Sequence, residues 1–418
     1  DVPETQGVKP AKSLRYWGHY PVVDIDYGTD APVSVSLRAW SPFIPGDAET
    51  SAIPAAVFVV VLENSTNKSQ SGRLAFNFPG PHPNESGSAT FKRSEQTRGD
   101  WKSLLVKSKR TSYAVAILDE GNATFGGNLS VGGEAWSKLD EQLPGTSPED
   151  GGTSAGVDFE LAAGEKKTIR FALAWHVTDW QGGAYDEIKH FDETWETNEF
   201  TLARTGRTER SKYLPNYSRK FDSLLEVIQL VAERQEEILG RILAWQSAIF
   251  SDTSLPVWLR SALVNNLSQF AEDSLWAAPE GELADWAAPL GAFQMTECPR
   301  TCAIVGCIAS NYYGDLPIVY FFPELERQIL RGYVAYLRPD GAVPFLYPPM
   351  DFTKASYEWQ IGLNGACFAD LVHRLWMRTG DRSILEEFYP AVKKNTTFTV
   401  GLTPGEHGII SFHREGTG

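Results

Sequence analysis

The sequence has little of what a membrane protein or a nucleic-acid-binding protein needs. Its longest apolar run, residues 52–62, has 11 residues and contains Pro54, whereas about 20 are needed to cross a bilayer. Only 38 Lys and Arg side chains stand against 53 Asp and Glu, for a formal net charge of −15. Because a phosphate backbone is bound by clustered basic side chains, we expect no membrane span and no nucleic-acid partner, and an uncharged or basic ligand.

Cysteine and histidine are also scarce, with four and seven residues. Three cysteines, Cys298, Cys302 and Cys307, follow a C-x3-C-x4-C spacing, and Cys367 is distant. Structural zinc sites use tighter C-x2-C pairs or nearby His, and phosphate loops and Gly-x-Ser-x-Gly elbows are missing. We expect no metal and no cofactor. The thiols are expected to be free and buried, or to form one disulfide, Cys298 with Cys302 or Cys302 with Cys307.

Asparagine shows an excess of one motif. Eight of the 13 Asn residues head an Asn-x-Ser/Thr sequon, where chance gives about two, and such sequons mark surface loops of secreted proteins. The chain begins with Asp1 and shows no signal-peptide pattern, so a signal is expected to be absent or removed. We therefore expect a secreted glycoprotein, with Asn266 excluded because it lies in a helical pattern. The expected sites are Asn64, Asn67, Asn84, Asn122, Asn128, Asn216 and Asn395. For Asn64 and Asn67, which share one polar loop, composition alone also explains the motif.

The periodicity of the chain changes near residue 205. Before it, short apolar runs such as residues 56–62 and the alternation of Val33, Val35 and Leu37 predict many short strands separated by Gly and Pro turns. Strands without intervening helices are typical of an antiparallel β-sandwich. We therefore expect a β-sandwich domain over residues 1–205.

After a linker predicted at residues 206–220, the period becomes helical. One apolar face runs from Phe221 to Trp245, and further helices are expected from Ser254 to about Phe270 and over 318–337, 359–379 and 383–400. We expect a helical domain over 221–418, which makes the chain a multi-domain β + α protein.

Several motifs carry a family resemblance. Residues 38–47 (RAWSPFIPGD), 255–260 (LPVWLR) and 322–327 (FPELER), with Thr379-Gly380-Asp381, keep the order of glycoside hydrolase family 116, which the chain resembles over most of its length. The resemblance implies a β-sandwich followed by an (α/α)6 catalytic toroid. The five or so helices expected here do not close a toroid, so residues 221–418 are expected to be its N-terminal part, completed by the remainder of the same polypeptide.

The resemblance also implies a retaining β-glycosidase, in which one carboxylate attacks the anomeric carbon and a protonated one releases the leaving oxygen. The nucleophile of the family lies on a loop before the FPELER block. The only carboxylate in the matching segment, residues 293–302, is Glu297, our candidate nucleophile. In a competing alignment Gln294 occupies that position, and the chain would be inactive. The acid is expected beyond Gly418.

Side chains that bind substrate are expected around Glu297. Arg300 and Thr301 follow it, Trp286 and Trp359 can stack on the apolar faces of sugar rings, and Asp315 and Asp351 can accept hydrogen bonds from hydroxyls, against the commoner role of helix capping. Two family partners of the sugar are replaced, by Phe345 and by residues 303–305, so glucose specificity is not assumed.

We therefore expect an exo-acting retaining β-glycosidase that hydrolyses β-glucoside-like or related carbohydrates through a glycosyl-enzyme intermediate. Two alternatives remain at this point. One is a non-catalytic carbohydrate-binding relative, and the other is an inverting hydrolase, phosphorylase or lyase on the same toroid.

Overall fold

The computed structural model describes residues 8–81, 86–119, 122–130, 133–177, 179–181, 212–298, 302–347, 351–353, 355–357 and 360–402. The chain forms two compact units. Unit 1 comprises residues 1–44, 49–178 and 220–266, and unit 2 comprises 45–48, 179–219 and 267–418. Each is described by itself below.

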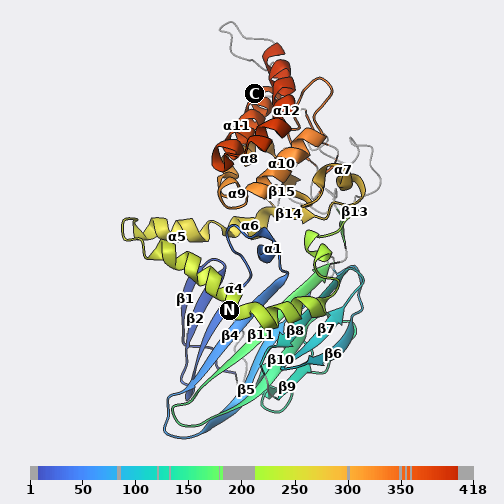
Figure 1. The fold of residues 1–418 in the computed structure, drawn as a ribbon. Coiled ribbons are helices and arrows are strands. Elements are labelled where there is room, and N and C mark those ends of the chain that lie inside the picture. The colour runs from blue at the N-terminus through green and yellow to red at the C-terminus, as the bar shows by residue number, and fades with distance from the viewer. Residues whose placement is uncertain are drawn as a thin grey trace, which may run out of the picture. The chain divides into compact units, whose positions relative to one another are not determined.

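Unit 1 is built on a large antiparallel sheet (Figure 1). Its strands pair in the order β1-β2-β3-β4-β11-β8-β7-β6. Their bounds are β1 Ser13–His19, β2 Val22–Gly28, β3 Val33–Trp40, β4 Ala55–Asn64, β6 Lys92–Arg98, β7 Trp101–Lys107, β8 Thr111–Ile117 and β11 Lys166–Val177, with a short helix α1 at Ala48–Ser51. Consecutive strands are antiparallel neighbours through β4, as the alternating pattern predicts.

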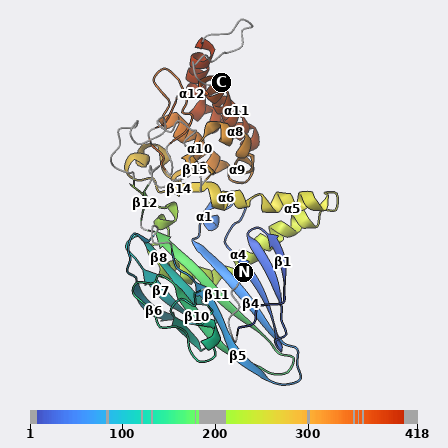
Figure 2. The same cartoon turned by 180° about the vertical axis from the view of Figure 1, so that it is seen from behind.

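A smaller sheet of β5 (Gln70–Phe78), β10 (Thr153–Leu161) and β9 (Ala123–Gly126) covers one face of the large one (Figure 2). Alternate residues such as Val60 and Leu62 point into the core between the sheets. Phe76 of the small sheet packs on Phe58 and Phe171 of the large sheet, with ring centroids 4.7 and 5.4 Å apart. The predicted antiparallel β-sandwich is confirmed.

The other face of the large sheet is covered by helix α4 (Leu224–Phe250), which contacts β4, β8 and β11 and is followed by α5 (Val257–Asn265). Its buried residues recur every three or four positions, among them Val227, Ile228, Val231 and Ile238. Each such side chain contributes about 1.5–3 kcal/mol when buried. The predicted domain boundary at residue 221 therefore differs from the observed one: both helices belong to the sheet unit, because the apolar face of α4 packs on the sheet.

Unit 2 is mainly helical. Its helices are α6 Ser268–Asp273, α7 Ala284–Ala287, α8 Ile308–Gly314, α9 Leu316–Phe321, α10 Pro323–Ala335, α11 Ile361–Thr379 and α12 Arg382–Gly401. Its strands are β12 Trp180–Gln181, β13 Lys212–Tyr213, β14 Ser274–Ala277, β15 Ala292–Cys298 and β16 Cys302–Val305. Helix α11 contacts α8, α10 and α12. The predicted order of a sheet domain followed by helices is confirmed, whereas the strands β14 to β16 were not predicted.

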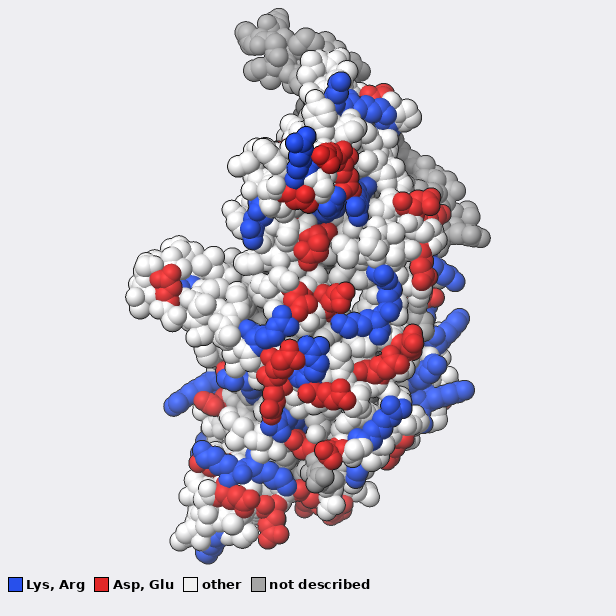
Figure 3. Space-filling view, viewed as in Figure 1, with Lys and Arg blue, Asp and Glu red and all other residues white. Residues whose placement is uncertain are grey.

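Acidic and basic side chains lie intermixed on the face of the molecule that Figure 3 shows. None of the helices in the described residues is both long and apolar enough to span a bilayer.

Candidate functional site

Glu297 lies near the end of β15, on a strand and not on the loop that the resemblance predicts. Strand β15 pairs with β14 and β16. The ladder to β16 pairs Thr296 with Val305 and Cys298 with Cys302, and its register shifts between Thr296 and Cys298. Irregularities of this kind redirect a side chain and occur often beside active sites. The side chain of Glu297 is exposed to solvent over part of its surface, and the partial burial of its carboxyl raises the pKa of that group.

Strands β15 and β16 form an antiparallel pair that we call the hairpin. Three buried side chains, Gln294, Asn311 and Tyr333, form a network that holds this hairpin on helices α8 and α10. We call it the amide network. Gln294 Nε2 donates to the carbonyl of Ile329 at 3.3 Å, and Asn311 Nδ2 lies 3.5 Å from Gln294 Oε1. Asn311 also donates to Tyr333 Oη at 3.0 Å, and Tyr333 donates to the carbonyl of Gly306 at 2.9 Å. Because buried polar groups are costly to leave unpaired, the network fixes β15, and the backbone at Gly306 just after β16, on α8 and α10.

Two glycines let the backbone approach this network closely. Gly306 has φ +58°, a conformation that glycine adopts at little cost, and a Cβ there would lie 2.9 Å from Gln294 Oε1. A Cβ at Gly332 of α10 would lie 2.9 Å from Gln294 Nε2 and 3.4 Å from the Trp286 ring. Gln294 is thus enclosed on two sides, which its place in the sequence did not reveal.

Cys307 lies beside the hairpin as a buried free thiol. Burial raises the pKa of this thiol, and the nearby negative charge of Glu297 raises it further, while hydrogen bonds involving Ser310 act in the opposite direction. Cys367 is likewise free, and burial raises its pKa to about 11. The predicted Cys302–Cys307 disulfide is therefore wrong. The side chains of Cys298 and Cys302 lie outside the described residues, so the other pairing stays a prediction.

Trp286 of α7 is half-buried. Its ring packs against α10 and meets Tyr336, the residue after that helix, edge to face at a centroid distance of 6.4 Å. The same ring and the Gln294 amide both lie close to the position that a Cβ on Gly332 would take. The indole is thus packed beside the amide network, and stacking on a sugar ring stays a prediction for it.

Asp315, at the junction of α8 and α9, is placed in the interior of unit 2 and not at the hairpin surface. It faces Glu326 of α10, which is fully buried. Burial raises the pKa of both carboxyls, that of Glu326 to about 8, and their mutual repulsion raises that of Asp315 further, with Arg374 opposing. Sequence reasoning missed Glu326, although it stands in the FPELER block.

Asp351 is also buried and its Oδ1 is already used. It accepts hydrogen bonds from the Tyr213 hydroxyl and from the backbone N and Oγ1 of Thr353, the last two at 2.8 Å. This oxygen therefore closes a turn with Thr353 and does not have the predicted role of binding a sugar hydroxyl. Three further predicted residues, Arg300, Thr301 and Trp359, lie outside the described residues.

Two of the predicted glycosylation sites are wrong for the folded chain. Asn64 is fully buried, and its Nδ2 donates to the carbonyls of Lys68, Leu161 and Ala162 at 2.7, 3.1 and 2.9 Å. Asn395 is buried with Nδ2 on the carbonyl of Gly341 at 3.0 Å. A glycan is attached through that nitrogen, so neither side chain can carry one in this fold.

The other described sequon residues are more accessible to solvent than Asn64 and Asn395. Asn67 and Asn122 are exposed, and Asn128 and Asn216 are half-buried. Asn84 lies outside the described residues. The excluded Asn266 is exposed at the C-terminal end of α5.

Comparison with known proteins gives one family and distant structural likenesses. The family model described as beta-glucosidase 2, glycosyl-hydrolase family 116 N-term, matches residues 2–237. A bacterial glucoamylase complexed with acarbose is similar at a TM-score of 0.39 and 8% identity, over 94% of this chain and 50% of that one.

Two further solved structures are similar at lower scores. A protein described as a kojibiose phosphorylase, from the human microbiome, has a TM-score of 0.35 at 10% identity, over 93% of this chain and 45% of that one. A family GH92 α-mannosidase from Bacteroides thetaiotaomicron has 0.28 at 9%, over 90% and 41%. The chain thus spans half or less of the length of these three structures.

Proposed function

Because residues 2–237 match the family model, the chain belongs to glycoside hydrolase family 116, and we propose that it is part of a retaining β-glycosidase whose nucleophile is Glu297. In this proposal unit 2 supplies part of an (α/α)6 toroid, which the remainder of the polypeptide completes. The substrate is a β-glucoside or a related β-glycoside, cleaved from the non-reducing end.

The observation that carries the assignment is the contrast between positions 294 and 297. The Gln294 side chain is 1% exposed and both ends of its amide lie against unit 2 atoms, so it cannot meet a substrate. Glu297, three residues on, is exposed at the irregularity of the ladder. This contrast supports Glu297, and not Gln294, as the side chain at the reacting position.

The chemistry of the chain's own residue is simple. The ionised Glu297 carboxylate attacks the anomeric carbon, the C–O bond to the leaving group breaks, and a protonated carboxyl from outside the described residues gives its proton to that oxygen. Water then cleaves the resulting ester, so the configuration is retained. The amide network keeps the hairpin in place during both steps, which matters because small displacements of a catalytic group are costly.

The pKa of Glu297 predicts one feature of the pH profile. The nucleophile acts only when ionised, and burial raises its pKa above the ordinary 4.5. The kcat/KM value is therefore expected to fall as the pH drops through a value above 4.5, since the carboxylate is lost by protonation there.

The test is covalent trapping in the full-length protein. We expect 2,4-dinitrophenyl 2-deoxy-2-fluoro-β-glycosides of glucose, galactose and xylose to inactivate it, and peptide mass spectrometry to find the label on Glu297. Glu297→Gln should lose at least 1,000-fold in kcat, while Glu280→Gln, an exposed Glu of the same unit, should keep its activity. Proton NMR should show the β-anomer first.

Four results would contradict the proposal. A label on another residue, or an active Glu297→Gln variant, removes Glu297 from the nucleophile role. Release of the α-anomer first indicates an inverting enzyme. A full-length protein that neither cleaves nor binds covalently any of the three sugars would favour the non-catalytic relative.

We also propose that the protein is secreted and carries N-linked glycans. The exposed sequon residues Asn67 and Asn122 support this, since both side chains are accessible to a transferase.

A further inference from the structure

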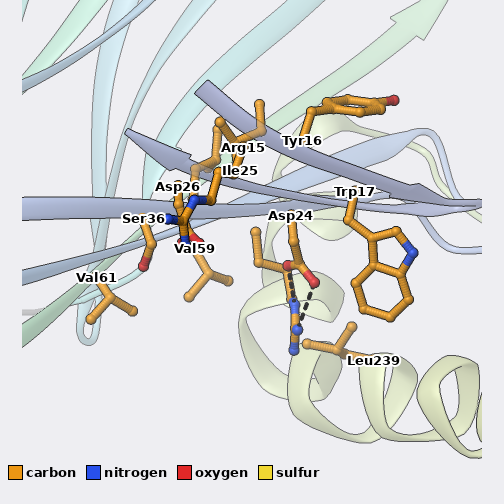
Figure 4. Close-up of a pocket in the computed structure, with 12 residues that line it drawn as sticks. Arg15, Tyr16, Trp17, Asp24, Ile25, Asp26, Ser36, Val59, Val61 and Leu239 are labelled. Carbon is orange, nitrogen blue, oxygen red and sulfur yellow. Dashed lines mark hydrogen bonds and ion pairs between the residues drawn. The ribbon is translucent and has the colours of Figure 1, made fainter. Parts of the chain in front are cut away.

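A cavity of about 570 Å³ opens on the α4 face of the large sheet in unit 1 (Figure 4). Its volume lies within the ~300–1,000 Å³ of small-ligand sites. Because Leu37 and Val60 pack into the sandwich core, the alternate residues of the same strands face α4. These are Arg15 and Trp17 of β1, Asp24 and Asp26 of β2, Ser36 and Arg38 of β3, and Val59 and Val61 of β4. We call this surface the sheet groove.

The floor of the sheet groove is apolar and only partly covered. Val59 and Val61 are half-buried, although they lie on a central strand of the large sheet, and Leu239 of α4 forms one side. Other residues on this face, such as Val57, are completely buried. The groove therefore offers aliphatic surface that a ligand with an apolar face could cover.

The charges along the groove balance. Asp24 and Arg38 form a bidentate pair, with Arg38 Nε 2.7 Å from Oδ1 and Nη2 2.9 Å from Oδ2. Arg15 and Asp26 are register partners on β1 and β2, and Ser36 adds a hydroxyl beside them. Two acidic and two basic groups give no net charge, which disfavours phosphates, sulfates and other anions and suits a neutral ligand with many hydroxyl groups.

An aromatic side chain, Trp17, lies at one end of these charged and polar residues of β1, β2 and β3. Trp17 is 54% exposed, and its ring stacks on His19 with centroids 3.9 Å apart and an angle of 23°. His19 is buried, and its two ring nitrogens lie 2.7 Å from Gln246 Oε1 and 3.1 Å from Asp24 Oδ2. Gln246 itself is held because its Nε2 donates to two backbone carbonyls. The indole is thus fixed before any ligand arrives, which lowers the entropy cost of binding.

We propose that the sheet groove is a binding site for a neutral oligosaccharide. One sugar ring stacks on Trp17, hydroxyls bind the Asp24–Arg38 pair and Ser36, and the C–H face of a neighbouring ring covers Val59 and Val61. Sugar rings combine an apolar face with equatorial hydroxyls, which is the combination of surfaces present here. The site belongs to unit 1, whereas Glu297 belongs to unit 2, so the proposal does not depend on the proposed function.

The test is binding of defined hexasaccharides to the full-length protein by isothermal titration calorimetry. The probes are cellohexaose, laminarihexaose and maltohexaose, with a heparin hexasaccharide as the anionic comparison. We expect at least one neutral probe to bind and Trp17→Ala to weaken it at least tenfold. Trp258→Ala, on α5 and 69% exposed without lining the groove, should stay within twofold of the unmodified protein.

Two more variants keep the test decisive. Ser36→Phe fills the groove without removing the ion pair or the indole, and should abolish the same binding. Glu297→Gln should leave it unchanged, because it alters the other unit. The proposal is overturned by any of four results: no neutral probe binds, the heparin probe binds more tightly, Trp17→Ala and Ser36→Phe bind normally, or Glu297→Gln abolishes the binding.

Discussion

Replacing Asn64 tests whether its sequon is a structural motif. Its amide accepts from the backbone N and the hydroxyl of Thr66 at 3.0 and 2.7 Å and donates to three carbonyls that lie up to 98 residues away in sequence. Two N–H groups serve those three acceptors, so Asn64→Ala removes four full-strength hydrogen bonds. At about 0.5–1.5 kcal/mol each, their loss should lower the free energy of unfolding by about 4 kcal/mol.

The assay is thermal unfolding monitored by circular dichroism. For a unit of roughly 200 residues, 1 kcal/mol shifts the Tm by about 2–4 °C, so Asn64→Ala should lower the Tm by about 8–16 °C. The matched control is Asn67→Ala. The side chain of Asn67 is exposed, so this replacement should lower the free energy of unfolding by less than about 0.5 kcal/mol. Peptide mass spectrometry of protein from a secreting eukaryotic host should find Asn64 unmodified.

Either of two outcomes would refute this reasoning. An Asn64→Ala protein as stable as the Asn67→Ala control would mean that the buried hydrogen bonds contribute nothing. A glycan on Asn64 would mean that the segment from β4 to β5 has a different conformation in the secreted protein.

Three further predictions follow from unit 2. Glu326→Gln should raise the Tm more at pH 8 than at pH 5, because the pKa of Glu326 is raised from 4.5 to about 8 in the folded state. The contribution of this carboxyl to stability is fully present below about pH 4.5 and is lost as the pH rises toward 8. Equal Tm shifts at both pH values would contradict this prediction. Tyr333→Phe removes the hydrogen bond to Gly306 and should lower the free energy of unfolding by about 1–3 kcal/mol. It should also lower kcat more than it changes KM. A variant with normal stability and normal kcat would contradict the role given to the amide network. Cys307 and Cys367 should react with a thiol reagent only after denaturation, because burial raises the pKa of both thiols; rapid labelling of the native protein would show that they are accessible.

The sequence predicted most of the fold because its periodicities are local. The alternation around Val33 and Val35 and the helical spacing from Phe221 onward both appear in the structure as expected. Periodicity does not say which partner an apolar face will meet, so it could not show that α4 packs on the sheet. It also failed for β15, where consecutive residues from Ala292 to Gln294 are all buried and no alternation is visible.

The candidate site was less predictable, because it depends on contacts between distant segments. A motif alone could not separate Glu297 from Gln294, whose burial results from α8 and α10. Asp315 and Asp351 were expected near a ligand because carboxylates can accept hydrogen bonds from sugar hydroxyls, but both side chains are buried. The sequon at Asn64 is a pattern of three adjacent residues. The hydrogen bonds of Asn64 to residues 161 and 162 form only when the β-sandwich brings these distant segments together, so the sequon could not reveal them.

The position of α4 has a consequence during synthesis on the ribosome. Strand β11 ends at Val177 and α4 begins at Leu224, so 46 residues must be translated before the helix that covers the sheet emerges. At about 5–20 residues per second, the apolar outer surface of the sheet stays open for several seconds, a natural target for chaperones. For the same reason, a recombinant N-terminal fragment should extend to residue 266, since one cut before residue 220 would leave that surface free to aggregate.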